Sequence, residues 1–129
     1  MPRPTPLNHM PWRWKAISGA DRVWRVDLNF APANKALGEK VSAALAPMGI
    51  VTGSRKAGGG TDVEPMIALQ KLAVVDMGQD GTRYFDLHHT PDDTLDKIDP
   101  VQLEQNVAAW TAVLQVVANE PGAISGQGE

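Results

Sequence analysis

Residues 23–30 read VWRVDLNF, and this alternation of residue types is typical of a β-strand. Successive side chains of a strand point to opposite faces of the sheet, so the alternation separates an apolar face from a mixed one. The apolar face is predicted to carry Trp24, Val26, Leu28 and Phe30, and the other face Val23, Arg25, Asp27 and Asn29. We therefore expect a strand that packs against the core through one face.

The segments after this strand alternate between helical and extended patterns. A helix is predicted over residues 33–47, and its apolar residues at helical spacing are Leu37, Val41, Ala44, Leu45 and Met48. Residues 50–52 suit an extended piece, 64–69 a short helix, and LAVVDM at 72–77 a buried strand. Strands that alternate with helices predict an α/β layer structure with a mostly parallel sheet.

The last predicted helix has the clearest boundaries. Asp99 can cap its start, Pro100 suits the first helical position, and Gln102 completes a capping box. Its apolar residues recur at spacings of four and three and predict one buried stripe, made of Leu103, Val107, Trp110, Leu114 and Val117. The helix is expected to end before Pro121.

These elements predict one domain over residues 21–120, with a flexible tail over 121–129. Four prolines break the pattern of residues 1–20, which we expect to be an irregular lead-in. The WRWK segment at 12–15 leaves two interpretations open, a flexible lead-in or an edge strand with one packed tryptophan.

Composition excludes several classes of function. A net charge of −3 and a pI near 5.5 give no basic face for nucleic acid. The most apolar run, residues 107–118, is far shorter than the roughly 20 residues of a membrane span. The chain has no cysteine, so a metal site would have to use His, Asp or Glu. The start of the sequence has no apolar signal-peptide core, and the compartment is left open.

The segment KAGGGTDVEPM, residues 56–66, predicts a glycine loop that leads into a short helix. It lacks the Gly-Lys-Ser/Thr of a phosphate loop, and Asp62 would repel an anion there. The loop is either a flexible connector or a segment that lets a substrate approach the backbone closely. On local grounds Asp62 is predicted to cap the helix that begins near Glu64.

The segment YFDLHHTPDDT, residues 84–94, contains two of the three histidines. In an extended segment His88 and His89 would point to opposite faces, so they are not expected to bind one metal together. Thr90 is a candidate helix cap, which places His89 just outside a helix N-terminus and favours its neutral, metal-binding form. The alternative is that both histidines are loop residues with ordinary hydrogen bonds.

The residues after His89 are expected to form that new helical turn. Thr90, Pro91 and Asp93 suit its cap, its first position and its third position. Asp92 or Asp93 is then a candidate to orient the His89 ring through its second nitrogen.

Residues 79–100, QDGTRYFDLHHTPDDTLDKIDP, with NVAAW at 106–110, strongly resemble the C-terminal signature of the two-zinc exopeptidases. These are the family of the secreted bacterial aminopeptidases and of carboxypeptidase Q. GGGTDVEPM at residues 58–66 is similar to the family's glycine-aspartate loop, and the similarity runs from about residue 23 to residue 118.

The resemblance implies the C-terminal part of a phosphorylase/hydrolase-like domain, a three-layer α/β sandwich with a mostly parallel or mixed sheet. It implies peptide-bond hydrolysis at a site with two zinc ions bridged by a carboxylate and a water, with a glutamate as general base. By position in the motif, His89 matches the last zinc ligand, and His88 matches a residue near the substrate that could stabilise an oxyanion. The remaining matches are Asp62 as the loop aspartate, Asp93 beside the ligand, and Gly59, Gly60 and Thr61 as the substrate loop.

The sequence departs from the family in its upstream metal ligands. It contains no His-x-Asp and no Glu-Glu, and His9 is its only other histidine. One ligand cannot hold two zinc ions, so we expect zinc to be absent or weakly bound and the chain alone to be inactive.

Two roles remain in view for such a chain. It would be part of a peptidase that acts on peptides in its complete form, whether as a truncated product, one half of a split protein or an expressed fragment. The rival is a non-catalytic binding or assembly module. Because part of the family's sheet is missing, we expect an exposed apolar edge or face, and either self-association or pairing with a missing N-terminal half.

Overall fold

The computed structural model describes residues 12–16 and 20–127, and it gives only the backbone of the first segment. The four strands are β1 (Trp12–Ala16), β2 (Val23–Asn29), β3 (Val51–Lys56) and β4 (Ala73–Gln79). The α-helices are α1 (Lys35–Leu45), α2 (Glu64–Gln70), α3 (Tyr84–Leu87) and α4 (Pro100–Ala118), with short 3-10 turns η2 (Pro32–Asn34), η3 (Ala46–Met48) and η4 (Leu95–Lys97).

The strands form one mixed sheet in the order β1-β4-β2-β3. β1 is parallel to β4 and β3 is parallel to β2, whereas the central pair, β2 and β4, is antiparallel. This arrangement confirms the predicted α/β class with a mixed sheet. The sequence allowed two interpretations of the WRWK segment, an edge strand or a flexible lead-in. In the structure this segment belongs to β1, which is an edge strand of the sheet.

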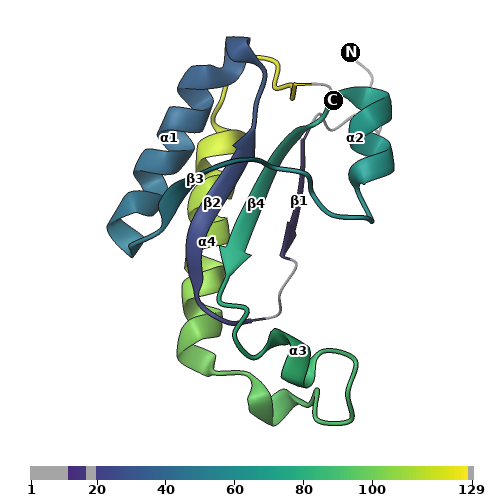
Figure 1. The fold of residues 1–129 in the computed structure, drawn as a ribbon. Helices are drawn as coiled ribbons and strands as arrows, with labels where there is room; N and C mark the ends of the chain where they lie inside the picture. Colours follow the sequence, from purple (N-terminus) through teal and green to yellow (C-terminus); the bar gives the residue numbers. More distant parts are fainter. Residues whose placement is uncertain (1–11, 17–19, 128–129) are drawn as a thin grey trace, which may run out of the picture.

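Helices cover both faces of the sheet and give three layers (Figure 1). On one face α1 and α4 pack side by side over the larger core cluster, which includes Val26, Met77 and Val113. On the other face α2 covers a smaller cluster that includes Ile67 and Val74. The predicted helix at 33–47 and the predicted elements at 64–69 and 72–77 correspond to α1, α2 and β4, with shifts of a few residues at their ends.

The prediction of a single apolar face for β2 is wrong. Trp24 is 47% exposed, whereas Asp27 and Asn29, on the predicted mixed face, are buried. The register with β4 shifts between Val23 and Arg25, and β2 is an inner strand of the sheet in which Asp27 is paired with Arg25 and Arg55. The Trp24 ring lies 4.8 Å from the guanidinium carbon of Arg25 instead of entering the core.

At the start of α4, Asp99 caps the helix as predicted, but Gln102 does not form the predicted capping box. The Asp99 side chain accepts a hydrogen bond from the Val101 N–H at 2.8 Å, which confirms the cap. Gln102 does not complete the box as expected. Its amide donates to the Asp99 carboxylate at 3.3 Å, and its oxygen accepts from the Arg22 N–H at 2.7 Å, which ties the helix to the entry of β2.

The buried stripe of α4 also differs from the predicted one. The core side consists of Asn106, Ala109, Val113 and Val117, so of the predicted stripe only Val117 is fully buried. Leu103 and Val107 are 42% and 58% exposed. The helix carries apolar residues around most of its circumference, so spacing alone does not decide which stripe faces the sheet.

The segment expected as a flexible tail has defined contacts up to Gln127. Asn34 donates to the Ala123 carbonyl at 2.9 Å and accepts from the Ser125 N–H at 3.0 Å. Asn29 accepts from the Gln127 N–H at 3.1 Å, and Ile124 is buried in the larger core cluster. None of the helices among the residues described is long and apolar enough to cross a membrane.

Candidate functional site

The two histidines lie on a long connection between β4 and α4, residues 80–99, which we call the histidine arm. The arm projects from the end of the sheet where β4 finishes (Figure 1). It begins with a turn in which Asp80 accepts hydrogen bonds from the N–H and the hydroxyl of Thr82, at 3.0 and 2.8 Å. These bonds stabilise the carboxylate and lower the pKa of Asp80.

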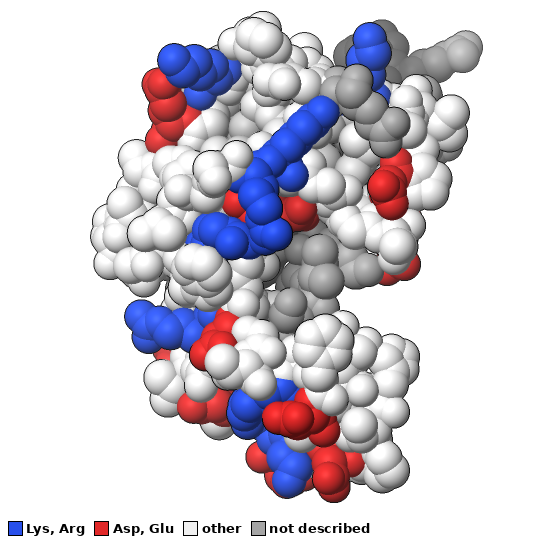
Figure 2. Space-filling model, viewed as in Figure 1, with Lys and Arg blue, Asp and Glu red and all other residues white. Residues whose placement is uncertain are grey.

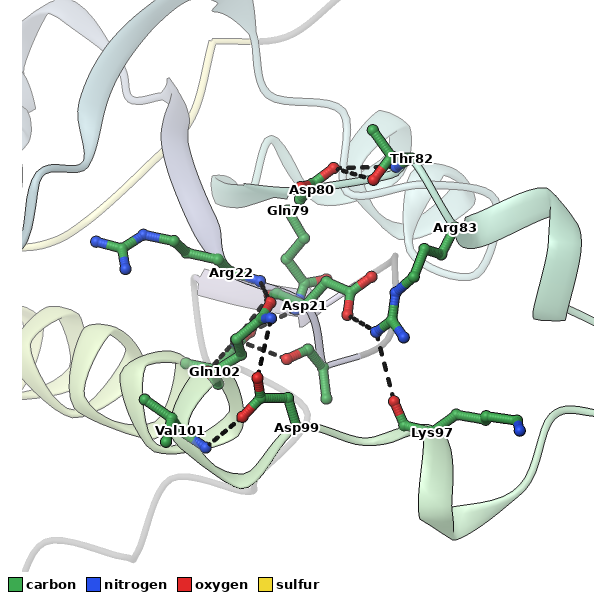
Figure 3. Close-up of polar contacts among 12 residues, drawn as sticks. Asp21, Arg22, Gln79, Asp80, Thr82, Arg83, Lys97, Asp99, Val101 and Gln102 are labelled. Carbon is green, nitrogen blue, oxygen red and sulfur yellow. Dashed lines mark hydrogen bonds and ion pairs between the residues drawn. The ribbon is translucent and has the colours of Figure 1, made fainter.

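Arg83 attaches the arm to the rest of the molecule. Its guanidinium donates to Asp21 at 2.5 Å and to the Lys97 carbonyl at 3.4 Å, so it joins the entry of β2 to both ends of the arm (Figure 3). The bond with Asp21 raises the pKa of Arg83. On the other side of this junction, the Asn106 amide of α4 donates to the Asp21 carbonyl at 2.8 Å.

His88 and His89 adopt different backbone conformations, and this brings their rings together. His88 ends α3, and its ring stacks on Tyr84 with 4.4 Å between centroids. His89 has a φ of 60°, in the left-handed region, and its ring meets the His88 ring edge to face at 3.8 Å. The expectation that they point to opposite faces is wrong, because it assumed an extended segment. Both side chains are exposed.

The segment after His89 forms one turn at the place where a helical turn was expected, and the Asp93 N–H donates to the Thr90 carbonyl across it at 3.1 Å. The Thr90 hydroxyl accepts from the Asp92 N–H at 3.2 Å and donates to the Leu87 carbonyl at 2.7 Å. The next regular element is the 3-10 turn η4, which starts at Leu95. Asp93 is exposed, and within the part of the chain that the structure describes no hydrogen bond joins Asp92 or Asp93 to either histidine.

The glycine loop, residues 57–63, follows β3 and crosses the sheet to reach α2 (Figure 1). Gly59 and Gly60 both have a φ of 70°, which a residue with a side chain rarely adopts. The prediction that Asp62 caps α2 is wrong. The cap residue is Val63, without a side-chain bond, and the Gly60 carbonyl accepts from the N–H groups of Val63 and Glu64.

Sequence reasoning missed Asp76, the residue of β4 that contacts this loop. Its carboxylate accepts from the Gly58 N–H at 2.8 Å and from the Gly59 N–H at 3.0 Å. One signal was present in the sequence: Asp76 is the only charged residue in the apolar run LAVVDM. A charge at a strand position of that kind needs a partner, and here the partner is backbone.

A cavity of about 360 Å³ lies against the inner side of the arm, and His88 belongs to its lining. Other lining residues are Asp21, Arg83, Tyr84, Leu87 and Ile98. Neither His89 nor the glycine loop lines it. On the face shown in Figure 2 the surface is also hollowed between the arm and the sheet.

These features do not add up to a complete metal centre. Among residues 12–16 and 20–127 no group of three or more His, Asp or Glu side chains could hold a metal ion. Among the described residues, His89 therefore stands as a single candidate ligand. His9 lies outside the described residues.

Comparisons with known proteins relate this chain to peptidases. No model of a protein family matches the sequence. Carboxypeptidase Q of Bos taurus is 35% identical over 94 residues, which cover 71% of this chain and 20% of that protein. The crystal structure of a peptidase M28 precursor from Shewanella amazonensis SB2B aligns with a TM-score of 0.77 and 35% identity, over 90% of this chain and 26% of that one.

The chain thus spans about a fifth to a quarter of the length of these two proteins. The likeness in structure extends over 90% of this chain. We therefore identify the chain as a carboxypeptidase Q-like relative of the M28 peptidases, matching one part of their length.

Proposed function

We propose that this chain carries one part of the active site of a zinc-dependent exopeptidase, of the aminopeptidase or dipeptidase type, and that His89 is its zinc ligand. The observation that carries the proposal is the left-handed backbone of His89. This conformation costs a residue with a side chain about 1–2 kcal/mol. Such strain persists mainly where the position of a side chain matters for function.

The described residues fit only a fraction of a zinc site. One exposed imidazole supplies a single ligand, whereas a catalytic zinc needs three protein ligands. The other ligands and the general base of the complete enzyme would have to come from residues outside those described. The contribution that we assign to this chain is therefore to present His89, and to place His88 and Tyr84 beside a peptide substrate through the cavity that they line.

Metal titration followed by NMR tests this role of His89. The ring resonances of the three histidines should be followed during titration with zinc, in the original chain and in His89→Ala and His9→Ala variants. We expect weak binding that perturbs His89 and is lost only in His89→Ala. Equal perturbation of all three rings, or unchanged binding in His89→Ala, would contradict the assignment. Purified chain with zinc and a chromogenic aminoacyl substrate should show no turnover.

A second candidate function, an assembly module, is favoured by the open flank of α4. This flank consists of Leu103, Val107, Trp110 and Leu114, which follow one another along the helix beside the buried stripe. Leu103 and Val107 remain 42% and 58% exposed, and Trp110 and Leu114 are half-buried. Contiguous apolar surface of this kind is typical of a contact site. We propose that it mediates self-association or pairing with an N-terminal half.

Sedimentation separates this candidate from an isolated domain. We expect the original chain to self-associate, and Val107→Lys to shift it toward monomer. Ala108→Lys, at an exposed position about 100° around α4 from Val107 and outside this flank, is the matched control and should leave the assembly unchanged. A monodisperse monomer at high concentration would count against self-association.

A further inference from the structure

The glycine loop is held to the sheet by one carboxylate, that of Asp76. Its Oδ2 accepts from the Gly58 N–H at 2.8 Å and from the Gly59 N–H at 3.0 Å, and its Oδ1 lies 3.2 Å from the Gly59 nitrogen. Two consecutive backbone N–H groups that converge on one anion form a concave binding site, called a nest. In this protein the anion that fills the nest belongs to the chain itself.

The backbone of the loop allows little freedom once Asp76 is bound. A Cβ atom at Gly59 would lie 2.5 Å from Cγ2 of Val63, so no side chain fits there. The Gly60 carbonyl, directly after the nest, accepts from the Val63 and Glu64 N–H groups at 3.1 and 3.0 Å and so starts α2. The bonds to Asp76 therefore determine both the shape of the loop and the direction in which α2 leaves it.

The neighbours of Asp76 in the sheet explain why its carboxylate bonds to the loop N–H groups. In the β2–β4 register Asp76 stands opposite Asp27, and like charges at such positions repel. Asp27 has cationic partners, since Arg25 Nε lies 3.0 Å and Arg55 Nη2 3.7 Å from its carboxylate. On this side of the sheet the two neighbouring carboxylates are thus stabilised separately, Asp27 by arginines and Asp76 by the loop N–H groups.

We propose that Asp76 is the built-in anion of the glycine loop, a positioning residue that fixes the conformation of Gly58 to Gly60 and, through the Gly60 carbonyl, the start of α2. Any contact of this loop with a peptide would rest on the proposed function, whereas the clamp between Asp76 and the nest does not. Because both N–H groups donate to Asp76, an external anion would have to displace this carboxylate to reach them.

Chemical rescue tests the proposal directly. In Asp76→Ala the nest is empty, and a small carboxylate from solution should replace the missing side chain. Amide exchange and chemical shifts of Gly58 and Gly59 are measured by NMR in the original chain, in Asp76→Ala, and in Asp86→Ala as a control that removes an exposed carboxylate from the arm. No metal or substrate is present.

We expect exchange at Gly58 and Gly59 to accelerate at least about tenfold in Asp76→Ala, the factor that the loss of hydrogen bonds to a charged group implies. Asp86→Ala should leave both amides unchanged. Added formate or acetate should restore their shifts in a saturable manner, whereas acetamide, similar in shape but neutral, should not. Unchanged amides in Asp76→Ala, or equal effects of acetate and acetamide, would overturn the clamp.

Two further measurements keep the outcome clear. If Asp76→Ala does not fold, the isosteric Asp76→Asn is compared instead, and the original chain must show slowed exchange at both amides. Fast exchange there would also overturn the proposal. If carboxylates rescue Asp76→Ala but zinc does not bind at His89, the clamp is supported and the proposed peptidase function is contradicted. If zinc binds at His89 but no rescue is seen, the zinc-ligand assignment is supported and the clamp is contradicted.

Discussion

The layered body of the protein and the histidine arm are stabilised in different ways. In the body, apolar side chains such as Val26 and Leu45 are completely buried between the sheet and two helices. In the arm, Phe85 and Leu95 are 88% and 83% exposed, and the conformation depends on polar contacts such as those of Arg83. The body therefore has its own hydrophobic driving force, whereas the arm depends on a few hydrogen bonds to hold the candidate site.

The largest expected effect is on the free energy of unfolding when a leucine is truncated in the body or in the arm. Leu45→Ala removes a fully buried side chain and should lower the free energy of unfolding by about 2–5 kcal/mol. Leu95→Ala, the same change in the arm, should alter it by less than about 0.5 kcal/mol. Urea denaturation followed by circular dichroism measures both. Similar losses for the two variants would show that the arm is packed more tightly than its exposure indicates.

The junction between body and arm should respond to loss of one buried amide. Asn106 accepts a hydrogen bond from the Gln79 amide, and its own amide donates to the Asp21 and Gln102 carbonyls, each of these two bonds being 2.8 Å long. Asn106→Ala removes these side-chain bonds from a buried position and should lower the free energy of unfolding by about 1–3 kcal/mol. Asn119→Ala, which removes an amide bonded to the Gln115 carbonyl on the surface of α4, is the control. Equal, small changes would contradict the role of Asn106.

Within the arm, a change at His89 should stabilise the fold while it removes the proposed function. His89→Gly relieves the left-handed backbone, and the free energy of unfolding should rise by up to about 1 kcal/mol. His88→Gly should have the opposite sign, because His88 has an ordinary φ of −55° and stacks on Tyr84. Thermal unfolding of the two variants measures the difference. A lower melting temperature for His89→Gly would show that contacts of the imidazole ring stabilise the fold by more than the left-handed backbone destabilises it.

The fold was largely predictable because the apolar runs are short and well separated. Strong caps and prolines mark the ends of α4, and LAVVDM could only be a buried element. What failed was the choice of face. Trp24 and Val107 have the spacing of core residues, and only tertiary packing leaves them exposed.

The candidate site was predictable to a smaller extent. The motif identified the arm and the loop, but the loop partner Asp76 is 17 residues from Gly59 and became visible only once β4 lay beneath the loop. The same holds for Arg83, whose partner Asp21 is 62 residues away. Contacts of this kind depend on strand order, which local periodicity does not contain.

The smallest expected effect is a response of the arm to acid. Hydrogen bonds from Thr82 lower the pKa of Asp80, and the Val101 N–H does the same for Asp99, both from an ordinary value of 3.8. Because the folded pKa lies below the unfolded one, each carboxylate contributes its full stabilisation above pH 3.8 and loses it as the pH falls through the folded value. Acidification should therefore loosen the Asp80 turn of the arm and the Asp99 cap of α4 only below that pH.

NMR titration of the Thr82 and Val101 amides follows the turn and the cap separately. Their shifts should change with midpoints below 3.8. Asp80→Asn should abolish the transition at Thr82 and leave that at Val101 in place, because the two carboxylates bond to different N–H groups. A midpoint at or above 3.8 in either amide would mean that the hydrogen bonds do not favour the charged form. The arm would then be held by the hydrogen bonds of Arg83 rather than by those of Asp80 and Asp99.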